Sequence, residues 1–97
     1  MSISVSATDI ALESNLNLMA AAPLAQKLTE QFNVPVLINA ENVDHIDLPC
    51  LQILIAASRQ WQSSDVSFEI KDMSEGFTNS LSALGLTPEI FHTPEST

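Results

Sequence analysis

The sequence is short of basic residues: three stand against twelve acidic ones, and the formal net charge is −9 at pH 7. Phosphate backbones and anionic lipid surfaces repel a protein of this charge, so nucleic acid is a poor partner and direct membrane insertion is not expected. A basic protein surface would be attracted instead. A high acidic charge can also serve solubility alone, and the composition leaves that alternative open.

Cysteine, glycine and long apolar runs are also scarce. The single cysteine, Cys50, cannot form an internal disulfide, and residues 1–14 lack the basic and long apolar regions of a signal peptide. No apolar run approaches the roughly 18 residues that a membrane-spanning helix needs. These features predict a cytosolic protein that reaches a membrane only through a partner. With glycine only at positions 76 and 85, the sequence also lacks a phosphate-binding glycine loop.

The chain does contain enough apolar material for a folded domain. Hydrophobic residues make up 45% of its 97 residues and the mean hydropathy is slightly positive, which is typical of a globular fold. A chain of this length buries one core. We therefore predict a single domain over residues 1–97, with residues 1–8 and 92–97 loosely held; residues 1–8 could instead form an edge strand.

Hydrophobic periodicity divides the chain into alternating strands and helices. Pro23 is tolerated only in a first turn, so the first helix is expected to begin at residues 20–22. Asp47 and Ser74 are the predicted N-caps of the other two helices, and Gly85 is the predicted left-handed C-cap. The predicted strands cover residues 9–14, 34–40 and 66–71, and the predicted helices end near residues 32, 62 and 84.

This order predicts an α/β fold: a small mixed, parallel-rich β-sheet with helices packed mainly on one face. The run of residues 34–40 is nearly continuous in apolar and β-branched residues, which is typical of a strand covered on both faces. It should be central in the sheet. Asn42 to Ile46 is expected to be a turn leading into the second helix.

Four segments follow this order along the chain: LNLMAAAPL, VPVLINAENVDHID, CLQILIAASRQW and SEGFTNSLSALGL. Together with the order of the elements, they resemble the STAS domain, the fold shared by bacterial anti-sigma factor antagonists and the tails of sulfate transporters. The resemblance implies a protein-binding regulatory module that docks a kinase-like anti-sigma or other signalling partner, without catalysis or a cofactor. A STAS accessory protein of a chemotaxis cluster or of a lipid-transport ATPase complex is the alternative.

The antagonists carry a short motif at the start of their second helix: Asp, two small hydroxyl residues, glycine and leucine. One hydroxyl accepts a phosphoryl group from a partner kinase. On this sequence the Asp falls on Asp47 and the leucine on Leu51, but the hydroxyl positions fall on Leu48 and Pro49 and the glycine on Cys50. Neither Leu48 nor Pro49 can be phosphorylated, so the resemblance implies a module that stays binding-competent or is controlled by its partner or its abundance.

The second helix has two unlike sides. At 100° per residue, one side gathers the core candidates Leu51, Leu54, Ile55, Ser58 and Trp61. The other side carries Gln52, Ile53, Ala56 and Gln60 and is uncharged, which suits an interface core; the alternative is a helix buried on both sides. The partner-binding residues predicted from this face, and from the helix start that the resemblance implies, are Asp44, His45, Asp47, Pro49, Gln52, Ile53 and Ala56.

A catalytic alternative would use Cys50 as nucleophile, His45 as base, and Asp44 or Asp47 to orient the base. The sequence gives no clear oxyanion hole or substrate cleft for it. At a helix start the macrodipole could make the Cys50 thiol reactive, whereas cysteine is also among the most often buried residues. Asp44, His45 and Asp47 lack a clear fourth metal ligand, so no metal site is predicted.

Overall fold

The computed structural model describes residues 8–32 and 34–91. Both chain ends predicted to be loose lie outside these residues, except Thr8, which opens the first strand. In chain order the elements are β1 (Thr8–Ala11), β2 (Asn15–Leu16), α1 (Leu18–Glu30), β3 (Val36–Asn39), β4 (His45–Ile46), α2 (Leu48–Ser63), β5 (Phe68–Lys71), α3 (Glu75–Ala83) and the 3-10 helix η1 (Pro88–Phe91).

The main sheet has three strands in the order β1-β3-β5, and both pairings are parallel. The predicted central strand is confirmed as β3. Ile10, Ile38 and Ile70 lie side by side in register across the three strands, and all three are buried. This row of isoleucines forms part of the floor of the hydrophobic core.

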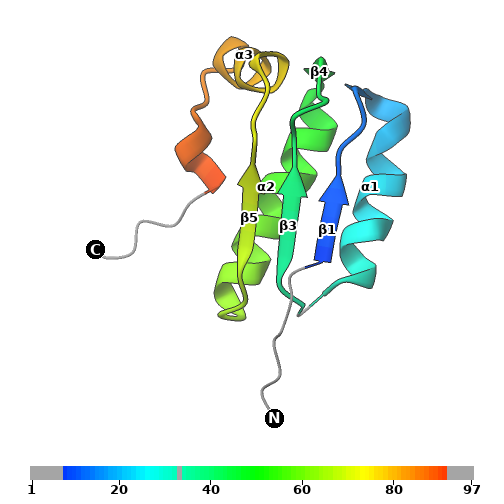
Figure 1. Cartoon of the computed structure of the whole chain (residues 1–97), viewed down its shortest axis with the longest axis vertical. Helices are drawn as coiled ribbons and strands as arrows, with labels where there is room; N and C mark the ends of the chain where they lie inside the picture. Colours follow the sequence, from blue (N-terminus) through cyan, green and yellow to red (C-terminus); the bar gives the residue numbers. More distant parts are fainter. Residues whose placement is uncertain (1–7, 33, 92–97) are drawn as a thin grey trace.

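Helices α1 and α2 cover the same face of this sheet. The strands follow one another across the sheet in chain order, and right-handed crossovers between parallel strands then put both connecting helices on one side. Figure 1 shows α2 behind β3 and β5, with α1 beside β1, and the two helices pack against each other. The α/β fold with helices mainly on one face is confirmed.

Helix α1 begins earlier than the sequence predicted. It starts at Leu18, with Asn17 as N-cap accepting a hydrogen bond from the Met19 N–H (3.0 Å), so Pro23 lies inside the helix. The prediction that Pro23 stands in the first turn was wrong. Proline lacks the N–H that would bond to the carbonyl four residues back, and Pro23 is exposed at the helix surface.

Helix α2 follows the prediction closely. Asp47 is its N-cap and Pro49 stands in its first turn. Trp61 is 3% exposed and its indole Nε1 donates to the Val34 carbonyl (2.8 Å), while Ser58 is fully buried and donates to the Ile55 carbonyl (2.9 Å). The inward side of the helix is therefore confirmed.

Two features were missed because they are too short to carry a period. β2 and β4 form a second, two-stranded parallel sheet, where only a turn was expected. Near the C-terminus, where no regular structure was predicted, η1 buries Phe91 against Phe77 with ring centroids 6.1 Å apart.

Candidate functional site

The candidate site begins where β4 leads into α2. The Asp47 carboxylate contacts Nε2 of His45 instead of capping the first turn of the helix. The backbone carbonyl of Asp47 accepts the first helical hydrogen bond, from the Leu51 N–H (3.1 Å). The side chains of His45 and Asp47 are 59% and 40% exposed, so the structure brings these two predicted residues together at the surface.

The loop before α2 is held on one side by β2. The Asp44 N–H donates to the Ser14 carbonyl (2.7 Å), and the Asp47 N–H donates to the Leu16 carbonyl (2.9 Å). These bonds satisfy backbone groups at both ends of β4. The loop is therefore part of the ordered fold.

Helix α3 holds the same loop on its other side through two serines. The Ser74 hydroxyl donates to the Val43 carbonyl and accepts the N–H of Phe77, so it both caps α3 and ties α3 to the loop. The Ser80 hydroxyl accepts the Ile46 N–H (3.3 Å). The position of the first turn of α2 thus depends on α3.

Gly76 makes the closest approach between α3 and the loop. A Cβ atom at this position would lie 2.2 Å from the Asp44 carbonyl oxygen and 2.6 Å from that of Val43. Real Cβ atoms do not come this close to backbone oxygens. Glycine is therefore required here for the packing of the two segments.

A shallow apolar hollow opens between the start of α2 and the end of α3, and we call it the notch. Its volume is about 130 Å³. Leu48 and Leu84, at its edge, are 45% and 43% exposed. Leu48 occupies one of the two positions that carry the hydroxyl residues in the resembling antagonists. The notch is lined by His45, Ile46, Asp47, Leu48, Ser80, Ala83 and Leu84.

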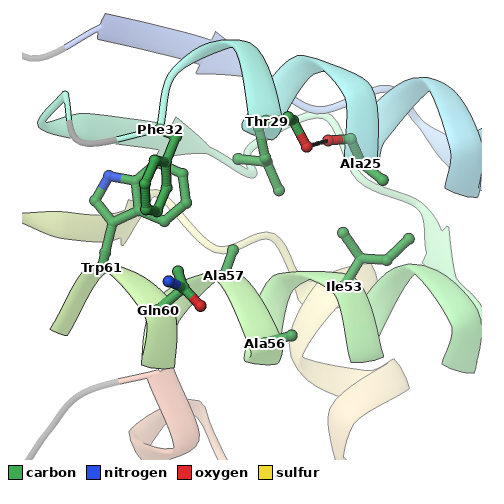
Figure 2. Close-up of a pocket in the computed structure, with 9 residues that line it drawn as sticks. Ala25, Thr29, Phe32, Ile53, Ala56, Ala57, Gln60 and Trp61 are labelled. Carbon is green, nitrogen blue, oxygen red and sulfur yellow. Dashed lines mark hydrogen bonds between the residues drawn. The ribbon is translucent and has the colours of Figure 1, made fainter. Parts of the chain in front are cut away.

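The outer side of α2 is open to solvent. Gln52 and Ala56 are exposed, and Ile53 is half-buried, so the alternative of a helix buried on both sides is wrong for this chain. Beside this side runs a second hollow of about 360 Å³, the α1–α2 groove, shown in Figure 2. It is lined by Ala25, Leu28, Thr29, Phe32, Ile53, Ala56, Ala57, Gln60 and Trp61.

Comparison with known proteins identifies the family. A family model described as "Mlab, STAS domain" matches residues 1–90. The chain belongs to the STAS domain family. Neither the search of curated proteins nor the search of solved structures gave a match. STAS domains are generally binding modules and commonly mediate protein–protein interactions, which makes this chain a regulatory module of that general kind.

Within this STAS domain, Cys50 does not join the exposed pair of His45 and Asp47. It is fully buried, and its Sγ donates to the Asn17 carbonyl (3.4 Å). Burial raises the pKa of the Cys50 thiol, and the negative charges of Asp47 and Glu13 raise it further. The prediction that the macrodipole lowers the pKa of this thiol is therefore wrong. A buried thiol with a raised pKa is a poor nucleophile, so the thiol-dependent alternative is not supported.

The described part of this STAS domain holds neither a metal-type cluster nor a membrane-spanning helix. Across residues 8–32 and 34–91, no three His, Cys, Asp or Glu side chains gather as a metal site would require. None of the helices in that part has the length and apolar character needed to cross a membrane.

The sequence predicted residues of α2 and of the loop before it that line the two hollows, but not the lining residues from α3 and α1. Leu84 and Ser80 of the notch come from α3, and Thr29 and Phe32 of the α1–α2 groove come from the first helix and the turn after it. A helical projection of α2 alone cannot identify them. Leu84 can be read from the sequence as a leucine before Gly85, but its exposure is seen only in the structure.

Proposed function

We propose that this STAS domain is a regulatory protein-binding module that docks its partner through the start and outer face of α2 and stays permanently competent to bind. The observation that carries the proposal is Leu48, an exposed leucine where the resembling antagonists have a hydroxyl that can be phosphorylated. Pro49, at the other hydroxyl position, also has no group to accept phosphate. The proposed docking residues are Asp44, His45, Asp47, Pro49, Gln52, Ile53 and Ala56.

The chemistry of this surface specifies the kind of partner. An apolar side chain of the partner would fill the notch beside Leu48, because burying the exposed leucines there is favourable in free energy. The exposed carboxylates of Asp44 and Asp47 would face basic residues. Gln52 and Ala56 add a flat, uncharged area on which another protein can pack closely.

One partner class is a kinase-like anti-sigma ATPase in the cytoplasm, whose capture would free a sigma factor. The family membership and the uncharged outer face of α2 support this class. With no phosphate acceptor at positions 48 and 49, release would depend on the partner's own nucleotide state or on the amounts of the two proteins.

A second class is a lasting complex, in which the domain is an accessory protein of a signalling cluster or of a lipid-transport ATPase. Leu48 and Pro49 stay uncharged because neither can be phosphorylated. This favours the lasting complex, since a permanent subunit needs no switch. In either class the docking surface is the same, and no reaction takes place on it.

The test compares two charge insertions of the same size on α2. Ala56→Arg places a cation in the proposed interface, and Gln62→Arg places the same cation on the exposed flank away from it. Both variants should keep the circular dichroism spectrum and melting temperature of the native domain. We expect the partner that copurifies with the native domain to bind Ala56→Arg at least about tenfold more weakly, a loss of roughly 1.4 kcal/mol. Equal affinities for the two variants would overturn the proposal.

A further inference from the structure

We propose that the α1–α2 groove receives an amphipathic helix of the partner protein, lying along both helices with its basic residues at the end near Asp44 and Asp47. This inference rests on the proposed function, because the groove adjoins the outer face of α2 and would be occupied by the same partner. It goes further by specifying a second contact and the secondary structure of the segment that makes it.

The groove lies between the facing sides of α1 and α2. Its α2 residues, from Ile53 to Trp61, recur at steps of three and four, and its helical α1 residues do the same. The rings of Phe32 and Trp61 meet edge to face at one end, with centroids 5.8 Å apart. In Figure 2, α1 and α2 face each other across the hollow, and Ile53 lies at the other end. This shape fits an apolar stripe of a helix.

The row of residues on α1 extends beyond the groove. Leu18, Ala22, Ala25 and Thr29 are spaced by four, three and four residues, which is a heptad pattern, and Phe32 follows in the turn after α1. Leu18 is 69% exposed and Phe32 is 45% exposed. Such a row normally faces another helix. At 1.5 Å per residue its helical part, from Leu18 to Thr29, is about 17 Å long, so it fits a partner helix of about three turns.

The row on α2 repeats this pattern beside it. Pro49, Ile53, Ala56 and Gln60 are spaced by four, three and four residues, and each is exposed or half-buried. Because α1 and α2 both connect parallel strands of one sheet, they run in the same direction. The two rows therefore form a seam open to solvent along which a third helix can pack.

Small polar ligands fit this groove poorly. The Thr29 hydroxyl already donates to the Ala25 carbonyl (2.8 Å), as drawn in Figure 2. In the described lining, the Gln60 amide then offers free donors and an acceptor, and the Thr29 hydroxyl oxygen can only accept. A ligand that depends on directed hydrogen bonds would find too few partners.

The distribution of charge points to a basic segment. In α1 and α2 together only Lys27, Glu30 and Arg59 are charged, and the described lining of the groove carries no charge. Asp44 and Asp47 stand at the end where the seam reaches the start of α2. A second copy of this chain, with a net charge of −9, would be repelled. An apolar helix with Lys or Arg at that end matches the uncharged lining of the groove and the two carboxylates.

The probe is a synthetic helical peptide of about 18 residues, long enough for the seam at 1.5 Å per residue. It carries leucines in the heptad pattern and a block of lysines at one end. The matched peptides are a scrambled sequence of the same composition and a version with glutamates for the lysines. Trp61, the single tryptophan of the chain, lines the groove and reports binding by its fluorescence.

We expect a saturable change in Trp61 fluorescence with the lysine peptide, binding at least about tenfold weaker with the glutamate peptide, and no binding of the scrambled peptide. Thr29→Arg, in the seam, should weaken binding, and Gln26→Arg, on the exposed flank of α1, should not. No binding of the lysine peptide, or equal binding by both variants, would overturn the inference. So would self-association of the domain through the seam, seen as a dimer in sedimentation that Thr29→Arg dissolves.

The native partner separates this inference from the proposed function. Leu48→Asp changes the notch alone, and Thr29→Arg changes the groove alone. Loss of partner binding in both variants supports both proposals. Loss of binding in Leu48→Asp only would overturn the inference about the groove and support the proposed function. Unchanged binding in both variants would overturn both proposals. Adsorption of the domain to phosphatidylglycerol vesicles through the seam, abolished by Thr29→Arg, would also overturn the inference that a partner helix occupies the groove.

Discussion

The α-carbon of Gly76 packs directly against the backbone carbonyl of Asp44, so closely that a methyl group at Gly76 would lie 2.2 Å from that oxygen. The contact joins α3 to the loop that leads into α2. It fixes the loop at the point where the proposed docking surface begins. If partners dock there, the stability of the fold and the shape of that surface are linked through one glycine.

Gly76→Ala should lower the free energy of unfolding by about 1 to 3 kcal/mol, because the loop or α3 must move to relieve the overlap. Partner affinity should fall as well, since Asp44 and His45 move with the loop. Chemical denaturation followed by circular dichroism measures the first effect, and titration with the partner measures the second.

The other glycine is the control for Gly76. Gly85 has φ of +76° and open space around its α-carbon. Gly85→Ala should cost about 1 to 2 kcal/mol through backbone strain, and Gly85→Asn should cost less because asparagine tolerates this conformation. Both should leave partner affinity unchanged. A Gly76→Ala variant as stable as the native protein would show that the contact is not required.

Trp61→Phe should destabilise the domain by about 1 to 3 kcal/mol. It leaves the Val34 carbonyl, which accepts a 2.8 Å hydrogen bond from the indole, without this partner in a part-buried setting. Thermal or urea denaturation monitored by circular dichroism provides the measurement, since the variant has no tryptophan to report. A cost near zero would mean that water replaces the indole at this carbonyl.

The stability of the domain should fall as the pH rises above about 8.5, the ordinary pKa of a thiol. Burial and two nearby carboxylates raise the pKa of the Cys50 thiol in the folded state. The unfolded chain then releases the thiol proton first, so alkaline pH favours unfolding by up to about 1.4 kcal/mol per pH unit. Urea denaturation at several pH values between about 7.5 and 9.5 tests this.

Cys50→Ala is the matched variant for this pH series. It should lose the part of the alkaline slope that belongs to the thiol, and it should still bind the partner. A slope equal to that of the native domain would contradict the raised pKa. Loss of biological activity in Cys50→Ala, with fold and complex intact, would instead revive a thiol-dependent function.

His45→Ala and Ser74→Ala should separate docking from folding. His45 and Asp47 form an exposed pair, so removing the imidazole should change the free energy of unfolding by less than about 1 kcal/mol. Ser74→Ala removes an N-cap and a tie to Val43, and should cost about 1 to 2 kcal/mol. Partner affinity should fall for His45→Ala despite its normal melting curve. An unchanged affinity would remove His45 from the docking surface.

The parts of the fold that the sequence predicted are those with a strong local pattern. The buried run of β3 and the two-sided helix α2, with Asp47 before it and Trp61 inside, follow from apolar periodicity and helix-end preferences. The start of α1 was misplaced because Asn17 supplies a cap that outweighs the usual restriction on Pro23. The rule for proline considers that residue alone and does not take a cap six residues earlier into account.

The remaining features depend on residues far apart in the chain. Asn15 pairs with His45 in the small sheet, and Phe91 fills a space beside Phe77. Neither contact leaves a periodic signal in its own segment. The same holds for the candidate site: the α2 residues could be named in advance, but Leu84 of the notch and Phe32 of the groove enter only when the helices have packed.

Ser74 and Gly76 hold the loop that leads into α2, yet neither residue lines the notch or the α1–α2 groove. Substitutions at these two positions can therefore change recognition without altering a residue of the proposed docking surface. Two homologues with the same contact residues could then prefer different proteins, and the change in binding specificity would be traced to positions that an inventory of interface contacts leaves out.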